Sequence, residues 1–158
     1  MIQTFKEFIT EAEKINFSNW VKPDDAAIKL EYQLEVVNKG MEYLFDGFPD
    51  FMKKVKQGKT MVVTPAIDRK ISYRSHTRNY DALLSLIKSY RSYPEFRNEG
   101  TLQAIYDGFR NNAKMKMPMV LQFPSGRYRV LGGNTRMDIA MHLGINPKVI
   151  IVPTNSEL

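Results

Sequence analysis

Residues 117–153, "MPMVLQFPSGRYRVLGGNTRMDIAMHLGINPKVIIVP", carry the clearest structural pattern of the chain. The apolar run 118–123 predicts a strand, and the Pro and Gly of the following "FPSG" suit a type I turn. The next segment, "RYRVL", then returns as the hairpin partner. Because side chains alternate along a strand, Arg127, Arg129 and Leu131 share one of its faces.

A helix and a last strand complete this pattern. The helix is predicted from about Thr135 to Leu143, because Thr135 and Asp138 have capping-box spacing and Gly144 suits the residue after a helix. The segment 147–153, "PKVIIVP", is rich in β-branched residues and predicts the closing strand.

Two glycines, Gly132 and Gly133, stand between the hairpin strand and the helix. A helix N-terminus exposes backbone N–H groups and attracts anions, and glycine lets a ligand approach the backbone closely. Arg136 lies in the first turn, and Arg127 and Arg129 lie on the incoming strand. The pattern therefore indicates a phosphate site, with an ordinary tight turn as the alternative.

The same stretch resembles the C-terminal part of the ParB/sulfiredoxin-like superfamily. It has a Pro-initiated strand, a hairpin strand, a G-x-x-R box, a helix ending in Leu-Gly and a closing strand. The resemblance implies an α+β fold, a small mixed sheet with packed helices, over residues 59–158. It also implies nucleotide binding, with CTP or ATP and Mg²⁺ as cofactors. The implied phosphate-binding residues are Gly132, Gly133, Asn134, Thr135 and Arg136.

The chain departs from the superfamily at several points. Asn134 stands where sulfiredoxins have their catalytic cysteine and partition proteins commonly have glutamate, and Thr135 replaces a histidine or arginine. The chain has no cysteine, so sulfinic acid reduction is excluded, as are disulfides and thiolate metal sites. Because only 22 residues follow the box, we expect no DNA-reading helix-turn-helix after it.

Helices are predicted for residues 1–58, which we expect to form a helical N-terminal extension. The segment 4–15 has capping-box spacing and one apolar face. A long helix capped by Asp25 is expected to bury an apolar stripe, and a short basic helix follows to Gln57. The stripe consists of Leu30, Leu34, Val37, Met41, Leu44 and Phe48.

In the middle of the chain, from residue 60 onward, the sequence pattern predicts one strand and two helices. The segment 60–67, "TMVVTPAI", is expected to form a strand and to be the first strand of the superfamily fold. An arginine-rich loop follows to about Tyr80. One helix then runs to Pro94, and a second begins at a Thr101 cap.

Positive charge is concentrated in one part of the chain. The formal net charge is +6, yet all nine arginines fall within residues 69–136. Arginine forks suit phosphate oxygens, which indicates an anion-facing surface, with an ordinary solvated basic face as the alternative. Arg74, Arg78, Arg127 and Arg129 are the predicted nucleic-acid contacts. DNA or a nucleotide is the expected partner.

Candidate catalytic residues are few. Asp68, at the end of the first predicted strand, could act as a base or metal ligand, although a solvated turn residue is the simpler interpretation. Asp138 and His142 are four residues apart and could form an acid–base pair or a surface contact. His76 lies in the arginine-rich loop, where it could contact nucleic acid, with a disordered basic loop as the alternative. We expect no resident protein metal site.

The first residues suggest an origin and a location. "MIQTFKEFITEA" resembles the N-termini of T-even-like phage proteins, and Ile9-Thr10-Glu11 before Ala12 is similar to their prohead-protease site. Residues 1–11 would then be a cleavable capsid-targeting leader; a capped surface helix is the alternative. No run of 18 apolar residues exists, so we expect no membrane partner. The resemblance to phage leaders implies a location in the bacterial host cytoplasm or the virion.

Two functions follow from these observations. The first is binding of a nucleotide or DNA phosphate, with phosphotransfer or nuclease chemistry as the reactions to test. The alternative is a non-enzymatic packaged phage effector that binds DNA or inhibits a host defence protein.

Overall fold

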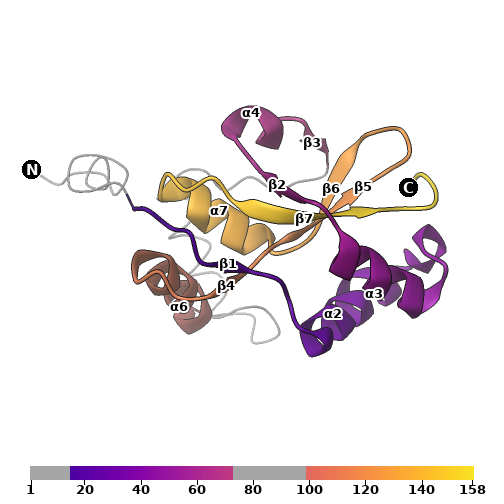
Figure 1. Ribbon diagram of the computed structural model, residues 1–158, viewed down its shortest axis with the longest axis horizontal. Helices are drawn as coiled ribbons and strands as arrows, with labels where there is room; N and C mark the ends of the chain where they lie inside the picture. The colour runs from indigo at the N-terminus through magenta and orange to yellow at the C-terminus, as the bar shows by residue number, and fades with distance from the viewer. Residues whose placement is uncertain (1–14, 73–98) are drawn as a thin grey trace, which may run out of the picture.

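The computed structural model describes residues 15–72 and 99–158, which form a mixed α+β fold (Figure 1). In chain order the elements are β1 (Trp20–Val21), α2 (Asp25–Glu31), the π-helix η1 (Tyr32–Val37), the 3₁₀ helix η2 (Glu42–Leu44), α3 (Gly47–Gln57), β2 (Thr60–Val62), α4 (Pro65–Asp68), β3 (Ile71–Ser72), α6 (Glu99–Arg110), β4 (Met115–Lys116), β5 (Met119–Gln122), β6 (Tyr128–Gly132), α7 (Asn134–His142) and β7 (Lys148–Pro153). Within these ranges, no helix has the length and apolar character needed to cross a membrane.

The main sheet has five strands in the order β2-β7-β5-β6-β3. β5 and β6 form the predicted antiparallel hairpin, and β7 runs parallel to β5 on its other side. The tight turn of the hairpin is closed by the Gly126 N–H, which donates to the Phe123 carbonyl at 2.8 Å. Gly126 has a φ of +90°, which explains the glycine at this point. The expected hairpin, helix and closing strand are confirmed, with ends that differ by one or two residues.

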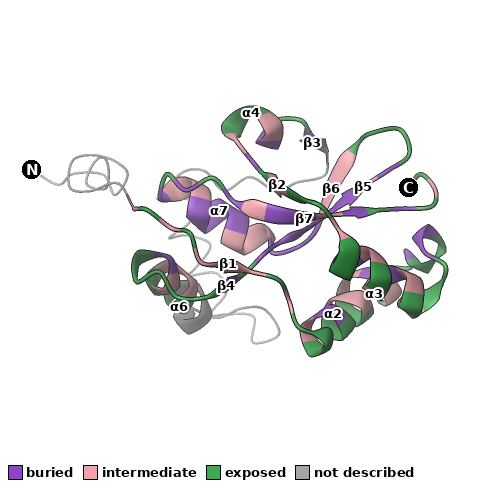
Figure 2. Ribbon diagram, viewed as in Figure 1, coloured by how far each residue is buried: buried purple, intermediate pink, exposed green. Residues whose placement is uncertain are grey.

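Alternating side chains of the central strands belong to two apolar layers, one on each face of the sheet. Figure 2 shows that β5, at the centre of the sheet, is buried along most of its length. Met119 and Leu121 pack against the N-terminal helices, whereas Val120 between them packs against Met137 of α7. The predicted orientation of the hairpin strand is also confirmed, since Leu131 joins the first layer and Val130 the second.

The N-terminal helical segment covers one face of the sheet. Its buried residues share one core with β5, β6 and β7, so this segment is part of the packing that holds the sheet. These residues are Ile28, Val36, Met41, Leu44, Phe45, Phe51 and Val55.

The predicted long helix after Pro23 is wrong in its cap and in its exposed face. Asp24, not Asp25, caps α2, and its Oδ1 accepts a hydrogen bond from the Ala27 N–H at 2.8 Å. The helix ends at Glu31 and continues as a π-helix, which changes the face presented to the sheet. Leu30 and Leu34 of the predicted core stripe are therefore 58% and 46% exposed.

The predicted strand 60–67 is also wrong beyond Val62. Thr64 accepts a hydrogen bond from the Ile67 N–H at 3.3 Å, and Pro65 occupies the first helical turn of α4. Proline lacks an N–H but has a helical φ, so it suits this position better than a strand interior. The apolar residues before it are enough to form only the three-residue β2.

A two-stranded parallel sheet, which the sequence did not predict, joins β1 to β4. Next to it, the Phe17, Trp20 and Phe109 rings pack edge to face with centroids 4.9 to 5.4 Å apart, which docks α6. α6 begins at Glu99, so Thr101 lies inside the helix and not at its cap. The expected helices over 4–15 and 80–94 lie mainly or wholly outside the described residues.

Asp50, in the first turn of α3, makes the stability of the fold depend on pH. The Asp46 N–H donates to its carboxylate at 2.9 Å, and this hydrogen bond, followed by contacts with Lys54 and Asn155, lowers the pKa of Asp50. A lowered pKa in the folded state stabilises the protein above the unfolded pKa, near pH 4, and the stabilisation is lost as pH falls further. We expect Asp50→Asn to cost about 1 kcal/mol at pH 7.

Urea unfolding of the wild type and Asp50→Asn between pH 7 and pH 3 measures this effect. The difference in unfolding free energy should shrink toward zero below pH 4. A difference that is constant over the range would contradict the assigned role of the charge.

Candidate functional site

The two glycines shape the turn from β6 into α7. Gly132 ends the strand, and Gly133 is the N-cap with φ +89° and ψ 18°, a left-handed conformation that favours glycine. The predicted Thr135 cap is therefore wrong. α7 begins at Asn134, and no side chain caps its N-terminus. The backbone N–H groups of the first turn are consequently the feature that this end of the helix presents.

Gly133 also brings two neighbours close to the backbone. A Cβ atom at this position would lie 2.7 Å from Cβ and 2.9 Å from Cα of Pro118. It would lie equally close, at 2.7 Å, to Nη2 of Arg136. The guanidinium of Arg136 thus lies over Gly133.

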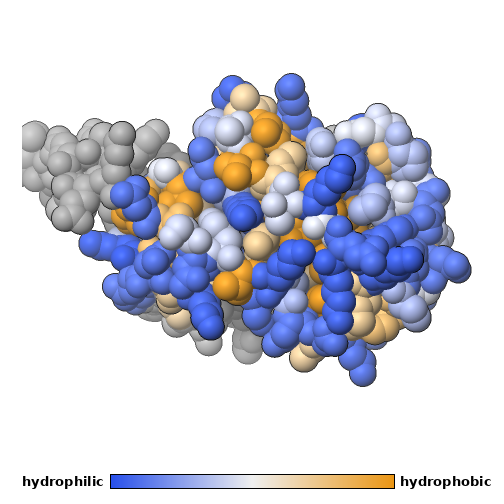
Figure 3. All heavy atoms as spheres, viewed as in Figure 1, coloured by the Kyte–Doolittle hydropathy of each residue, from blue (hydrophilic) through white to orange (hydrophobic). Residues whose placement is uncertain are grey.

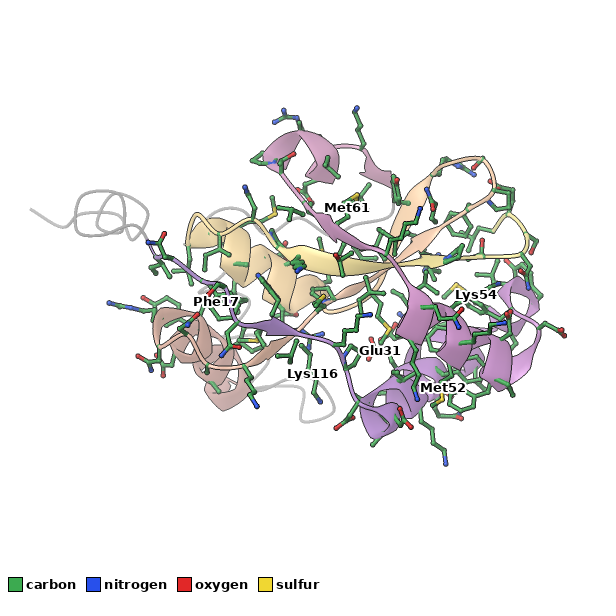
Figure 4. All side chains as sticks on the ribbon, viewed as in Figure 1. Phe17, Glu31, Met52, Lys54, Met61 and Lys116 are labelled. Carbon is green, nitrogen blue, oxygen red and sulfur yellow. The ribbon has the colours of Figure 1, made fainter. Side chains whose placement is uncertain are left out.

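A carboxylate covers Gly132. A Cβ atom there would overlap Oε1 and Cδ of Glu31 and lie 3.2 Å from its Cγ. Glu31 is the last residue of α2 and reaches the end of β6 from the N-terminal helical layer (Figure 4). The adjacent glycines are therefore covered by opposite charges, a carboxylate over Gly132 and a guanidinium over Gly133.

These side chains line one pocket of about 220 Å³ between the N-terminal helical layer and the sheet. Its charged lining consists of two cations, Lys116 and Arg136, and one anion, Glu31. The remaining lining residues are Pro23, Ala27, Leu30, Met117, Met119 and Gly132. Pockets for whole small-molecule ligands usually measure 300 to 1,000 Å³, so this one suits a single charged group of a larger ligand.

The structure brings together only part of the predicted phosphate site. Gly132 and Arg136 line the pocket and Gly133 contacts Arg136. Asn134 and Thr135 are half-buried in the first turn of α7 and are not among the lining residues. The box thus contributes its glycines and its arginine to the pocket.

The two aspartates predicted as catalytic are not among the residues that line this pocket. Asp68 is fully buried in α4, so its interpretation as a solvated turn residue is wrong. Asp138 is 6% exposed and lies within α7, in register with His142 one turn later. Each aspartate interacts with other groups of the protein. Their catalytic roles stay predictions.

The predicted nucleic-acid contacts are distributed over the chain. Arg127 is exposed, and its Nη2 lies 3.9 Å from Oε1 of Glu157. Arg129 is half-buried in β6. Arg74 and Arg78, together with His76, lie outside the described residues. Neither Arg127 nor Arg129 lines the pocket.

Glu31 and Lys116 line the pocket but were not predicted from the sequence. Glu31 lies 101 positions before Gly132 in a segment whose pattern indicates only a surface helix, so no local signal could identify it. Lys116 lies in "KMKMP", immediately before the resembling stretch. Its charge next to that stretch is the one available signal.

Comparisons of the chain with protein-family models, with curated proteins and with solved structures give no match. Among residues 15–72 and 99–158, no group of three His, Cys, Asp or Glu side chains is arranged to hold a metal ion. The interpretation of the site therefore depends on its geometry.

Gly132→Ala tests the position of Glu31. The new methyl group would overlap the carboxylate and displace it, so we expect a loss of about 1 kcal/mol of unfolding free energy. In a Glu31→Ala background the methyl group meets no carboxylate, and the same change should cost little. Urea unfolding of the four proteins in a double-mutant cycle measures the coupling. Additive effects would show that Glu31 does not cover Gly132 in solution.

Gly133→Ala tests the turn itself. Alanine at a φ of +89° is strained by about 1 to 3 kcal/mol, and its Cβ would also press on the Pro118 backbone. Gly144→Ala is the matched control, because Gly144 has a φ of +74° with no atom within 4 Å of a Cβ. We expect a clearly larger drop in Tm for Gly133→Ala. Equal drops would mean that close packing at Gly133 contributes nothing.

Proposed function

We propose that this protein is a ParB/sulfiredoxin-like protein that binds a phosphate group of a nucleotide or nucleic acid at the N-terminus of α7. The observation that carries the proposal is the pocket in which Arg136 and Lys116 meet Gly132 beside the first turn of the helix. Backbone N–H groups at a helix N-terminus, together with a guanidinium fork, are the donors that phosphate binding needs. The order strand, Gly-Gly and helix supports the same assignment.

The pocket dimensions favour a ligand that enters by its phosphate. At about 220 Å³ the pocket is too small to enclose a nucleotide, and the rest of the ligand would lie at its mouth. Leu30, which lines the pocket and is largely exposed, is available there for apolar contact. The pocket lining also suits a magnesium–nucleotide complex, since Mg²⁺ is commonly bound by one or two carboxylates together with substrate phosphates. Glu31 is the carboxylate that the pocket offers.

Nucleic acid is the large partner that the charge distribution favours. The formal net charge is +6, and residues 69–136 hold all nine arginines. On the face drawn in Figure 3, hydrophilic residues cover most of the described surface and apolar residues occupy small separate areas. Binding that depends on phosphate contacts should weaken steeply with salt, because each neutralised phosphate releases condensed counterions. Phosphotransfer and phosphodiester cleavage stay predictions, since neither Asp68 nor Asp138 lines the pocket.

A second candidate, a non-enzymatic effector that binds a host protein, is favoured by one observation. Leu30, Leu34 and Tyr43 are 46% to 58% exposed on the N-terminal helical segment. Burial of exposed apolar side chains of this size against a partner protein is favourable, because it removes apolar surface from water. For such an effector, Arg136→Ala would preserve function and charged replacements of Leu30 and Leu34 would abolish it.

Arg136→Ala tests the phosphate site. We expect wild-type Tm to rise with at least one of CTP, ATP or GTP, with or without Mg²⁺, because a ligand bound to the folded state stabilises it. Arg136→Ala should lose this rise, since it removes the guanidinium that lines the pocket. Arg136→Lys keeps the charge without the fork and should retain part of it. Thermal shift measured with millimolar nucleotide compares the proteins.

Arg110→Ala is the matched control. Arg110 is exposed on α6, where it donates to the Tyr106 hydroxyl at 3.1 Å, and it does not line the pocket. The nucleotide-induced rise in Tm should be unchanged in this variant. Absence of a wild-type response to every nucleotide and to short duplex DNA, or a response of Arg136→Ala equal to that of the wild type, would overturn the proposal.

A further inference from the structure

We infer that Glu31 acts as an intramolecular competitor for the phosphate site, so that its carboxylate occupies the Gly132 position until a more highly charged anion displaces it. This inference rests on the proposed function and concerns the regulation of the same pocket. It assigns a binding role to the N-terminal helical layer, which the box motif alone does not include.

The position of Glu31 is that of a bound anion. Its carboxylate takes the space above Gly132 that a side chain would fill, two residues before α7 begins. This is the end of the helix that attracts negative charge. Lys116 and Arg136 are the two cations that line the same pocket as this carboxylate. The features proposed to bind phosphate are therefore already used by an anion of the chain itself.

Charge decides which ligands can compete. A phosphate group that enters beside Glu31 brings a second anion into a pocket with two cations, and like charges side by side oppose binding. A singly charged ligand gains nothing over the resident carboxylate. A phosphate with nearly two negative charges gains more from Lys116 and Arg136 and can displace it. Glu31 thus favours phosphate esters and polyphosphates over carboxylate ligands.

Displacement requires only a local change. Glu31 is half-buried at the end of α2, and the neighbouring Leu30 is largely exposed, so the pocket mouth lies next to solvent. A glutamate side chain has several accessible rotamers, and rotation away from Gly132 would free the glycine backbone. The backbone of α2 and of the π-helix that follows need not move.

Isothermal titration calorimetry with pyrophosphate tests the inference, because pyrophosphate has the phosphate chemistry without a base. Glu31→Gln removes the charge and keeps the size of the side chain. We expect its Kd for pyrophosphate to be about tenfold lower than that of the wild type. Glu31→Ala also opens the space and should bind at least as tightly. Glu42→Gln removes an exposed carboxylate outside the pocket lining and should match the wild type. Circular dichroism and Tm confirm that each variant is folded.

The outcomes separate the competitor role from the proposed function. Binding to Glu31→Gln or Glu31→Ala but not to the wild type would support both. Wild-type binding that requires Arg136, with equal or weaker binding by both Glu31 variants, would overturn the competitor role and leave the phosphate site intact. Weaker binding by the Glu31 variants only when Mg²⁺ is present would also overturn it, because Glu31 would then be a metal ligand. No binding by any of these proteins would overturn the phosphate site and the competitor role together.

Discussion

The direction of β7 constrains the rest of the C-terminal half. β7 runs parallel to β5, whereas β6 is the antiparallel partner on the other side of β5, so β6 ends at the end of the sheet where β7 begins and the chain must pass from one side of β5 to the other. α7 makes this connection. The sharp turn into this helix uses the left-handed conformation of Gly133. The helix N-terminus is consequently fixed at the end of β6, next to a pair of glycines.

The turn between β6 and α7 is also where the N-terminal helical layer contacts the sheet. The N-terminal helical layer shares its apolar core with β5, β6 and β7, and Glu31 is the charged residue by which this layer reaches the glycine pair. Lys116 lies in β4, which pairs with β1. Three separate segments of the chain thus form the pocket, and they place side chains of opposite charge next to the backbone of Gly132. The two glycines therefore have two roles: they form the turn into α7, and they leave space for the side chains that pack over them.

Local patterns predicted the elements whose neighbours in sequence are also their neighbours in space. The hairpin from Met119 to Gly132 and the helix after it follow from alternation and turn residues. The prediction of one long helix was wrong because the π-helix changes which side chains face the sheet. Tertiary packing, and not the local pattern, decides that Ile28 and Val36 are buried while Leu30 is exposed. Gly132, Gly133 and Arg136 were recognisable because the box is contiguous. Glu31 was not, because only the folded chain places it there.

The π-helix from Tyr32 to Val37 has one further consequence. Its hydrogen bonds span five residues, as between the Asn38 N–H and the Gln33 carbonyl at 3.0 Å, so it contains one residue more per bonded turn than an α-helix. A chain shorter by one residue in this segment would close it as a regular helix, and every later side chain would rotate relative to Glu31. The length of this short segment therefore sets how Glu31 is oriented relative to the apolar core that follows it.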